Sequence, residues 1–156
     1  MKTKAILIVV ALGALAGISA ALAASSTTPT ITVVTAASGG GFPQQSSYAG
    51  VSLQEWLVGT GVQVSSDGSA TGEFEATLKG KSKSADVNIF LVGEAATGSV
   101  TSGTAQFSGT ATLGGLKGLS ATTGFSVTIS ASSLQLTIGT TTLPTMALGT
   151  GEAFIG

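Results

Sequence analysis

The sequence predicts an all-β protein: a single antiparallel sandwich or barrel of about eight or nine short strands after a cleaved signal peptide. Three observations predict this class. Apolar and polar residues alternate with a period of two from Val62 to Ile155. Turn residues separate the alternating segments, and Gly alone accounts for 23 of the 156 residues. After Leu57, no segment has a 3.6-residue apolar period long enough for a helix.

The N-terminal residues have the three parts of a secretory signal peptide. Lys2 and Lys4 supply positive charge, Ala5–Ile18 is uncharged and apolar, and Ala21–Ala23 places small residues where a signal peptidase reads. We therefore expect cleavage before Ala24 and a secreted, extracellular or cell-surface protein with no membrane contact afterwards. A retained anchor is disfavoured because the second half of the run is rich in Gly, Ala and Ser, and no basic cluster follows it.

The chain is expected to have three parts: a signal peptide at residues 1–23, an N-terminal strand and Gly-rich tether at 24–50, and an antiparallel β domain at 51–156. Within the second part, Thr30–Ala36 is mostly β-branched, which predicts a strand, and Ser38–Pro43 is typical of a flexible connector.

The start of the third part is ambiguous. Ser52 is followed by Glu55 with the spacing of a capping box, which predicts a single helical turn at Ser52–Leu57. The alternation of Val51 and Leu53 is equally compatible with the start of a strand.

Further along, alternation marks one strand after another. Asp67-Gly68 is a strong hairpin-turn signal, and Thr71–Lys79 alternates as a half-buried strand does. Asp86–Val92 is apolar on both faces, as in a central strand covered on both sides, and Glu94–Ser99 is expected to be a turn. The other predicted strands are Gly61–Ser65, Thr104–Leu113, Phe125–Ser130, Leu134–Ile138, Leu143–Leu148 and Glu152–Ile155.

Composition excludes several kinds of chemistry. Charged residues make up only 8% of the chain, and it contains no Arg, His or Cys. Ser-His-Asp and Cys-His catalysis, imidazole or thiolate metal sites and disulfides are therefore excluded. A weakly acidic chain without Arg also argues against nucleic-acid binding. We expect no enzyme activity, no cofactor and no metal.

The remaining candidates for chemistry have simpler interpretations. Glu73 and Glu75 project from one face of a strand and are interpreted as part of a solvated face rather than an acid–base pair. Lys79, Lys81 and Lys83 are interpreted as a charged turn that keeps a hairpin end soluble.

Tyr48 and Trp56 are the only Tyr and Trp, and they are candidates for a surface contact. The alternative for Trp56 is that it covers one end of the core, as a largely buried Trp commonly does.

Two functions remain open. The leading hypothesis is a secreted, non-catalytic structural or surface protein, a self-assembling filament or matrix subunit whose partner is a second copy of itself. Its N-terminal strand would complete its own sheet or a neighbour's. The residues of this candidate assembly strand are Thr30, Ile31, Thr32, Val33, Val34 and Thr35. The alternative is a β-barrel carrier of a small apolar ligand. An outer-membrane barrel is disfavoured because aromatic girdles are missing.

Overall fold

The computed structural model describes residues 28–116 and 120–156, so the predicted signal peptide at residues 1–23 lies outside the described residues. In this part of the chain the structure consists of strands and their connections, with no helix, and the all-β prediction is confirmed. The strands are β1 (Ile31–Tyr48), β2 (Val51–Ser65), β3 (Ala70–Ser82), β4 (Ala85–Thr101), β5 (Thr104–Gly114), β6 (Ala121–Ile129), β7 (Ser133–Ile138), β8 (Thr141–Thr142), β9 (Met146–Ala147) and β10 (Ala153–Ile155).

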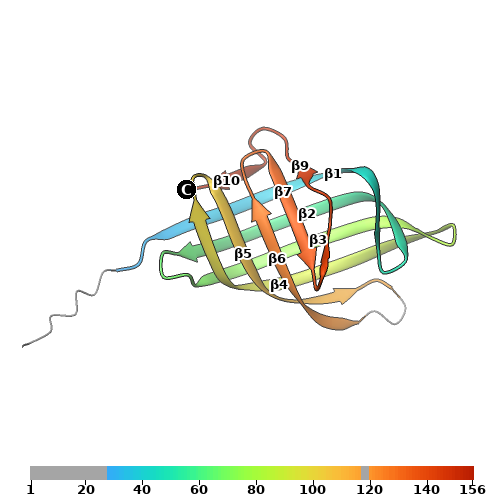
Figure 1. Cartoon of the computed structure of the whole chain (residues 1–156), viewed down its shortest axis with the longest axis horizontal. Coiled ribbons are helices and arrows are strands. Elements are labelled where there is room, and N and C mark those ends of the chain that lie inside the picture. The colour runs from blue at the N-terminus through green and yellow to red at the C-terminus, as the bar shows by residue number, and fades with distance from the viewer. Residues whose placement is uncertain (1–27, 117–119) are drawn as a thin grey trace, which may run out of the picture.

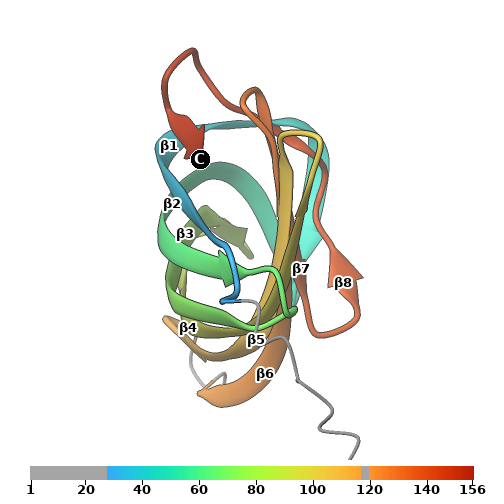
Figure 2. The ribbon, with the colours of Figure 1, turned by 90° about the vertical axis from the view of Figure 1, so that its left-hand side faces the viewer.

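All ten of these strands belong to one antiparallel sheet (Figure 1). Its order is β10-β1-β2-β3-β4-β5-β6-β7-β8, and β9 also pairs with β7. The sheet curls strongly, so that β5, β6 and β7 pass across β1, β2 and β3 (Figures 1 and 2). Among the described residues no ladder joins β8 or β9 to β1 or β10, so the sheet is open.

Tight turns connect the long strands. The turn residues Ala49-Gly50, Lys83-Ser84 and Ser102-Gly103 all have positive φ, as in type I′ turns, whose twist matches that of the flanking strands. The predicted turn at Asp67-Gly68 is confirmed between β2 and β3. There the Asp67 carboxylate accepts hydrogen bonds from the backbone N–H and the hydroxyl of Ser69, at 2.9 and 2.6 Å.

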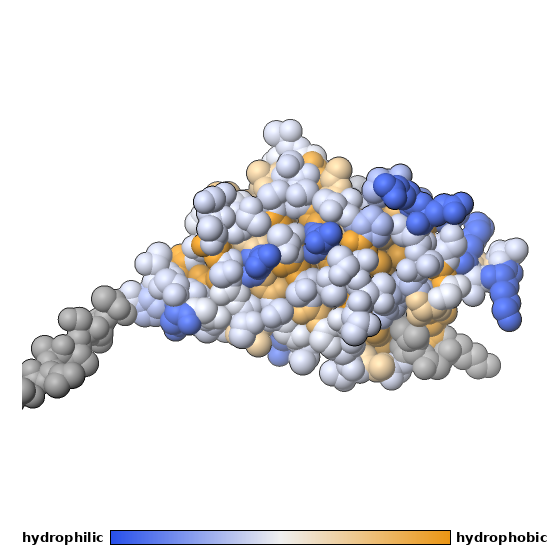
Figure 3. Space-filling view, in the orientation of Figure 1, coloured by the Kyte–Doolittle hydropathy of each residue, from blue (hydrophilic) through white to orange (hydrophobic). Residues whose placement is uncertain are grey.

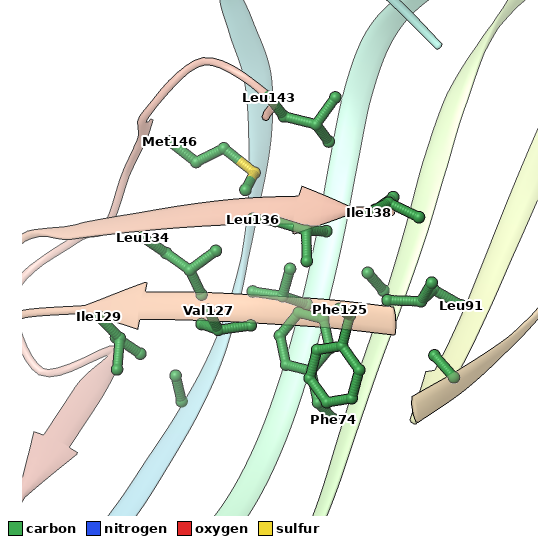
Figure 4. Close-up of a cluster of buried hydrophobic side chains, with 14 of the residues drawn as sticks. Phe74, Leu91, Phe125, Val127, Ile129, Leu134, Leu136, Ile138, Leu143 and Met146 are labelled. Carbon is green, nitrogen blue, oxygen red and sulfur yellow. The ribbon is translucent and has the colours of Figure 1, made fainter. Parts of the chain in front are cut away.

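The concave face of the curled sheet holds the core. Alternate residues of the long strands are buried, as the period of two predicts. Phe74 stacks on Phe125 with 5.5 Å between ring centroids, and Phe107 meets the two rings edge-on at 6.1 and 6.4 Å. Figure 4 shows the aliphatic side chains of β6 and β7 pointing into the same interior as Phe74 and Leu91. One face of one sheet therefore encloses the whole core.

Two glycines inside strands allow this close packing. A Cβ at Gly93 would lie 2.6 Å from the ring of Phe125 and 2.9 Å from the Cβ of Ala111. A Cβ at Gly109 would overlap the carbonyl oxygen of Glu94 on the neighbouring strand. No larger side chain fits at either position without a shift of the sheet, which agrees with the small inward residues of this region.

The sequence predicts a flexible connector at the Gly-rich segment Ser38–Pro43, but this segment lies inside β1. Gly39–Gly41 pair with residues 55–57 of β2. Packing gives the reason: a Cβ at Gly40 would lie 3.3 Å from the Trp56 ring, and one at Gly39 would lie 2.5 Å from the Leu57 side chain. Glycine serves here to admit large neighbours, not to loosen the chain.

Two other local expectations are wrong. Ser52–Leu57 is strand and not a helical turn, as the alternation of Val51 and Leu53 also allowed, and its register with β3 shifts between Leu53 and Glu55. Glu94–Ser99 is not a turn, because β4 continues to Thr101 with a register shift between Ala95 and Thr97.

The central strand is covered on one face only. Ile89 and Leu91 are buried, whereas Phe90 and Val92 are 47% and 52% exposed on the convex face of β4. The expectation that Asp86–Val92 is covered on both faces is therefore wrong, because a single curled sheet has one buried face.

Replacing one buried ring tests this core. Phe74→Ala should lower the free energy of unfolding by about 3–5 kcal/mol, because it removes the ring that contacts both other phenylalanines and leaves a cavity. Phe90→Ala, the matched exposed phenylalanine one strand away, should cost about 1 kcal/mol or less. Urea unfolding followed by circular dichroism measures both, and equal losses would contradict the assignment of the buried face.

Candidate functional site

The candidate assembly strand, Thr30–Thr35, forms the beginning of β1 and its approach. On one side it pairs with β2, from Ile31 opposite Ser65 onward. On its other side it pairs with β10, where Val34 lies opposite Ile155 and hydrogen bonds of 2.8 and 3.1 Å join Val33 to Gly156 in both directions. Both edges of Val33–Thr35 are thus occupied within the chain, whereas residues 30–32 have a partner only on the β2 side among the described residues.

Three apolar side chains are exposed together on the outer side of β1 and β10. Ile31 is 50% exposed, Val33 38% and Phe154 60%. Ile31, Val33 and Thr35 point to the same face of β1, because alternate residues of a strand do so. Thr35 is the cross-strand partner of Phe154, so Phe154 lies on that face too. The Phe154 ring lies close to Gly156, which exchanges two backbone hydrogen bonds with Val33. We call these three residues the end patch.

The end patch lies beside the opening of the sheet. β9 approaches β1 without pairing with it, and the segment between β9 and β10 passes from one end of the sheet to the other (Figure 2). Its first part is held on β7's side by a hydrogen bond of 2.9 Å from the backbone N–H of Leu148 to the carbonyl oxygen of Ser132. The connecting segment between β9 and β10 thus runs between the two ends, and β10 itself pairs only with β1.

Glu152 fixes the second part of this segment. Its carboxylate accepts hydrogen bonds from the hydroxyl of Ser38 on β1 and from the backbone N–H of Gly149. These two bonds, the Ser38 bond first, hold the pKa of Glu152 below its ordinary value. The ladder continues here with a 3.0 Å bond from the Ala37 N–H to the Glu152 carbonyl oxygen.

Beyond Ser38 the outer edge of β1 has no backbone partner among the described residues. This part contains Pro43, which has no N–H to donate, and an irregularity in its register with β2 between Gly41 and Ser46. Proline and bulges both hinder the addition of a further strand. The regular edge of β1 is therefore the stretch that β10 covers.

Trp56 is buried and not available for the predicted surface contact, whereas the surface contact of Tyr48 stays a prediction. Trp56 is only 1% exposed, and its Nε1–H donates a 3.3 Å hydrogen bond to the carbonyl oxygen of Gly41, so it covers one end of the core. Tyr48 is partly buried against the core, and burial raises the pKa of its phenol.

A second surface lies on the convex face of β2 to β5. Leu57, Phe90 and Val92 are each about half exposed there. Glu73 and Glu94 face each other across β3 and β4, and a shallow groove of about 470 Å³ runs between them and Phe90. Neither glutamate forms a salt bridge within the described residues. Unpaired like charges beside apolar side chains are compatible with a solvated face or with a weak contact site.

The lysines lie toward the β3–β4 hairpin. Lys81 pairs with Asp86 at 2.8 Å and Lys79 with Glu55 at 3.5 Å, both on the surface. Strongly hydrophilic side chains gather at the end of the molecule formed by the β1–β2 and β3–β4 hairpins (Figure 3). This fits the interpretation of these lysines as a solubilising turn.

Other kinds of site find little support in residues 28–116 and 120–156. No three acidic side chains gather there as a metal site would require. Nor does this part of the chain contain a helix with the length and apolarity needed to cross a bilayer. In comparisons with known proteins, the chain matches no family model, no curated protein and no solved structure.

Sequence reasoning missed the end patch and the role of Glu152. Phe154 was expected to belong to a closing strand, and its three-residue ladder with β1 could not be read from the sequence. One signal in the sequence could have indicated both: the apolar Ala153–Ile155 directly follows Glu152, the single acidic residue of an otherwise uncharged stretch.

The Glu152 bonds predict a pH-dependent contribution to stability. Because the folded-state pKa is lowered, this contribution is present above the ordinary value of 4.5 and disappears as the pH falls through the lower folded-state pKa. Glu152→Gln should therefore be less stable than the unsubstituted chain at pH 7, and the difference should shrink below pH 4.5. Urea unfolding at several pH values measures it. Ser38→Ala should remove much of the same effect, and a difference that stays constant down to pH 3 would contradict the assignment.

The facing glutamates give a second test. Glu94→Lys places opposite charges across β3 and β4, and it should raise the free energy of unfolding by about 0.2–1 kcal/mol. Glu94→Gln, the matched control, should give a smaller gain. Thermal unfolding at low salt measures both, and a loss of stability with Lys would show that the two carboxylates have another partner.

Proposed function

We propose that this protein is a secreted, non-catalytic structural or surface protein that assembles with copies of itself through the open end of its sheet. The observation that carries the proposal is the end patch. Ile31, Val33 and Phe154 are exposed together on the predicted assembly strand and its neighbour, beside an end of the sheet that no ladder closes. Exposed apolar clusters at such a place are typical of contact surfaces.

The distribution of chemistry-bearing side chains supports a non-catalytic role. The carboxylates of Glu73, Glu75 and Glu94 are on the exposed convex face, where water hydrates them. A general acid or base normally lies in a cleft that shifts its protonation toward the working pH. The N-terminal sequence supports export, since it has the charge, apolar run and small residues of a signal peptide.

The carrier hypothesis has less support. A carrier keeps room for a ligand inside the sheet, but here the rings of Phe74, Phe107 and Phe125 pack against one another in the interior. Native mass spectrometry of the purified chain tests it directly: an apolar molecule retained at a one-to-one ratio would favour the carrier over the structural protein.

Weakening the end patch tests the assembly. The unsubstituted chain should form species larger than the monomer as its concentration rises, measured by sedimentation velocity. Ile31→Thr with Val33→Thr should reduce these species at least several-fold, because Thr keeps the strand preference and removes exposed apolar surface.

The matched control is Leu57→Thr with Val92→Thr, which removes similar apolar surface elsewhere on the convex face and should leave assembly unchanged. A chain that stays monomeric at every concentration would overturn the proposal. Equal loss in both variants would show that contact is not localised at the end patch.

A further inference from the structure

β10 is attached in a way that sets it apart from the body of the sheet. It contributes three residue pairs, all to β1, and hydrogen bonds at Gly156 and Glu152 extend this ladder by one residue at each end. By contrast, β1 pairs with β2 along most of an 18-residue strand. Separation of β10 therefore breaks far fewer bonds than separation of β1.

Little core is lost when β10 leaves. Ala153 and Ile155 are partly buried and lie at the border of the core, while Phe154 is exposed. The preceding segment includes Gly149, Thr150 and Gly151, and Gly151 has a φ of +81° in a turn. A change of the turn at such residues is the usual way in which a terminal strand swings away from its own domain.

We propose that β10 is the exchangeable strand of this protein, and that it pairs with β1 of a second copy in place of its own β1. This inference rests on the proposed self-assembly and names the contact that performs it. The donor is thus β10, and the acceptor is the β1 edge at residues 33–37, which overlaps the candidate assembly strand at Val33–Thr35.

The second copy is the occupant that the structure favours. The β1 edge at residues 33–37 fits Glu152–Gly156 in register, with Ser38 placed to donate to the Glu152 carboxylate, and an identical chain supplies the same sequence. Exchange keeps every one of these contacts, so its cost is confined to the connecting segment. The rest of the β1 edge is blunted by Pro43 and by the register shift after Gly41, which disfavours simple addition of a foreign strand there.

Exchange also produces a directional assembly. Each copy has one donor, β10, and one acceptor edge on β1, so two copies can exchange reciprocally into a dimer, or successive copies can join head to tail. In either arrangement the end patch changes its composition: Val33 of one copy lies beside Phe154 of the other. The end patch is then formed by residues of two copies and marks the junction between them.

Cysteine pairs locate the exchanged strand, and the chain offers a background with no Cys. Ala36 and Ala153 are directly opposite each other across β1 and β10, and Cys is a small change from Ala. Chains with Ala36→Cys are mixed at high concentration with differently tagged chains carrying Ala153→Cys, then oxidised. We expect disulfides that join the two substituted positions of different chains, identified by peptide mass spectrometry.

The matched control uses Gln63 and Thr71, which face each other across the β2–β3 hairpin. Chains with Gln63→Cys alone, mixed with chains with Thr71→Cys alone, should give no cross-link between chains above background. A chain with both substitutions should form only the disulfide within itself. This control shows that the disulfide reports pairing and not collision.

The outcomes separate the two proposals. Assemblies detected by sedimentation velocity, in which a chain carrying both Ala36→Cys and Ala153→Cys forms disulfides only within itself, would overturn strand exchange and leave self-assembly standing. A chain that is monomeric at every concentration, before and after refolding at high concentration, would overturn both. Deletion of Thr150 and Gly151, which shortens the path back to its own β1, should raise the exchanged fraction; an unchanged or lower fraction would count against exchange.

Discussion

The stacked rings of Phe74 and Phe125 mark the contact on which the rest of the structure depends. They come from β3 and β6, which lie three positions apart in one sheet, so they meet only because the sheet curls back over itself. Without the curl that brings them together, the apolar face of the sheet would be exposed to water. Gly93 makes the contact sterically feasible, since any Cβ there would collide with the Phe125 ring. The sheet therefore has to curl in order to bury its core.

A core built in this way leaves two ends to the sheet. Curling buries the apolar face of the sheet. It does not supply hydrogen-bond partners for the outer backbone N–H and C=O groups of the first and last strands. The chain covers one end with the short β8 and β9 and the other with β10. Short strands contribute few hydrogen bonds, so the ends are the least firmly held part of the ladder. This connects the fold to the proposed function: association is expected where the sheet's own chain supplies the weakest cover.

The sequence was most informative where alternation is regular. The strand at Thr71–Lys79 and the turn at Asp67-Gly68 follow from local chemistry alone, and the structure confirms both. It was misleading at glycines inside strands. In Gly39–Gly41 and around Gly98 the small residue accommodates a neighbouring side chain or carbonyl group, a contact made by residues distant in sequence. The end patch could not be derived either, because its exposure depends on where the sheet stops, which is a property of the complete topology.

The edge formed by β1 and β10 differs from most edge strands in its lack of charge. β1 and β10 contain no charged residue, although charge on an edge strand is a common means of preventing association. The protective features on β1, Pro43 and the register shift, are confined to its second half. Its first half is covered instead by β10, anchored through Glu152 and Ser38. In the proposed exchange, β10 of a second copy would take this place and specify the partner, because an identical chain supplies the same hydrogen bonds and the same carboxylate contact with Ser38.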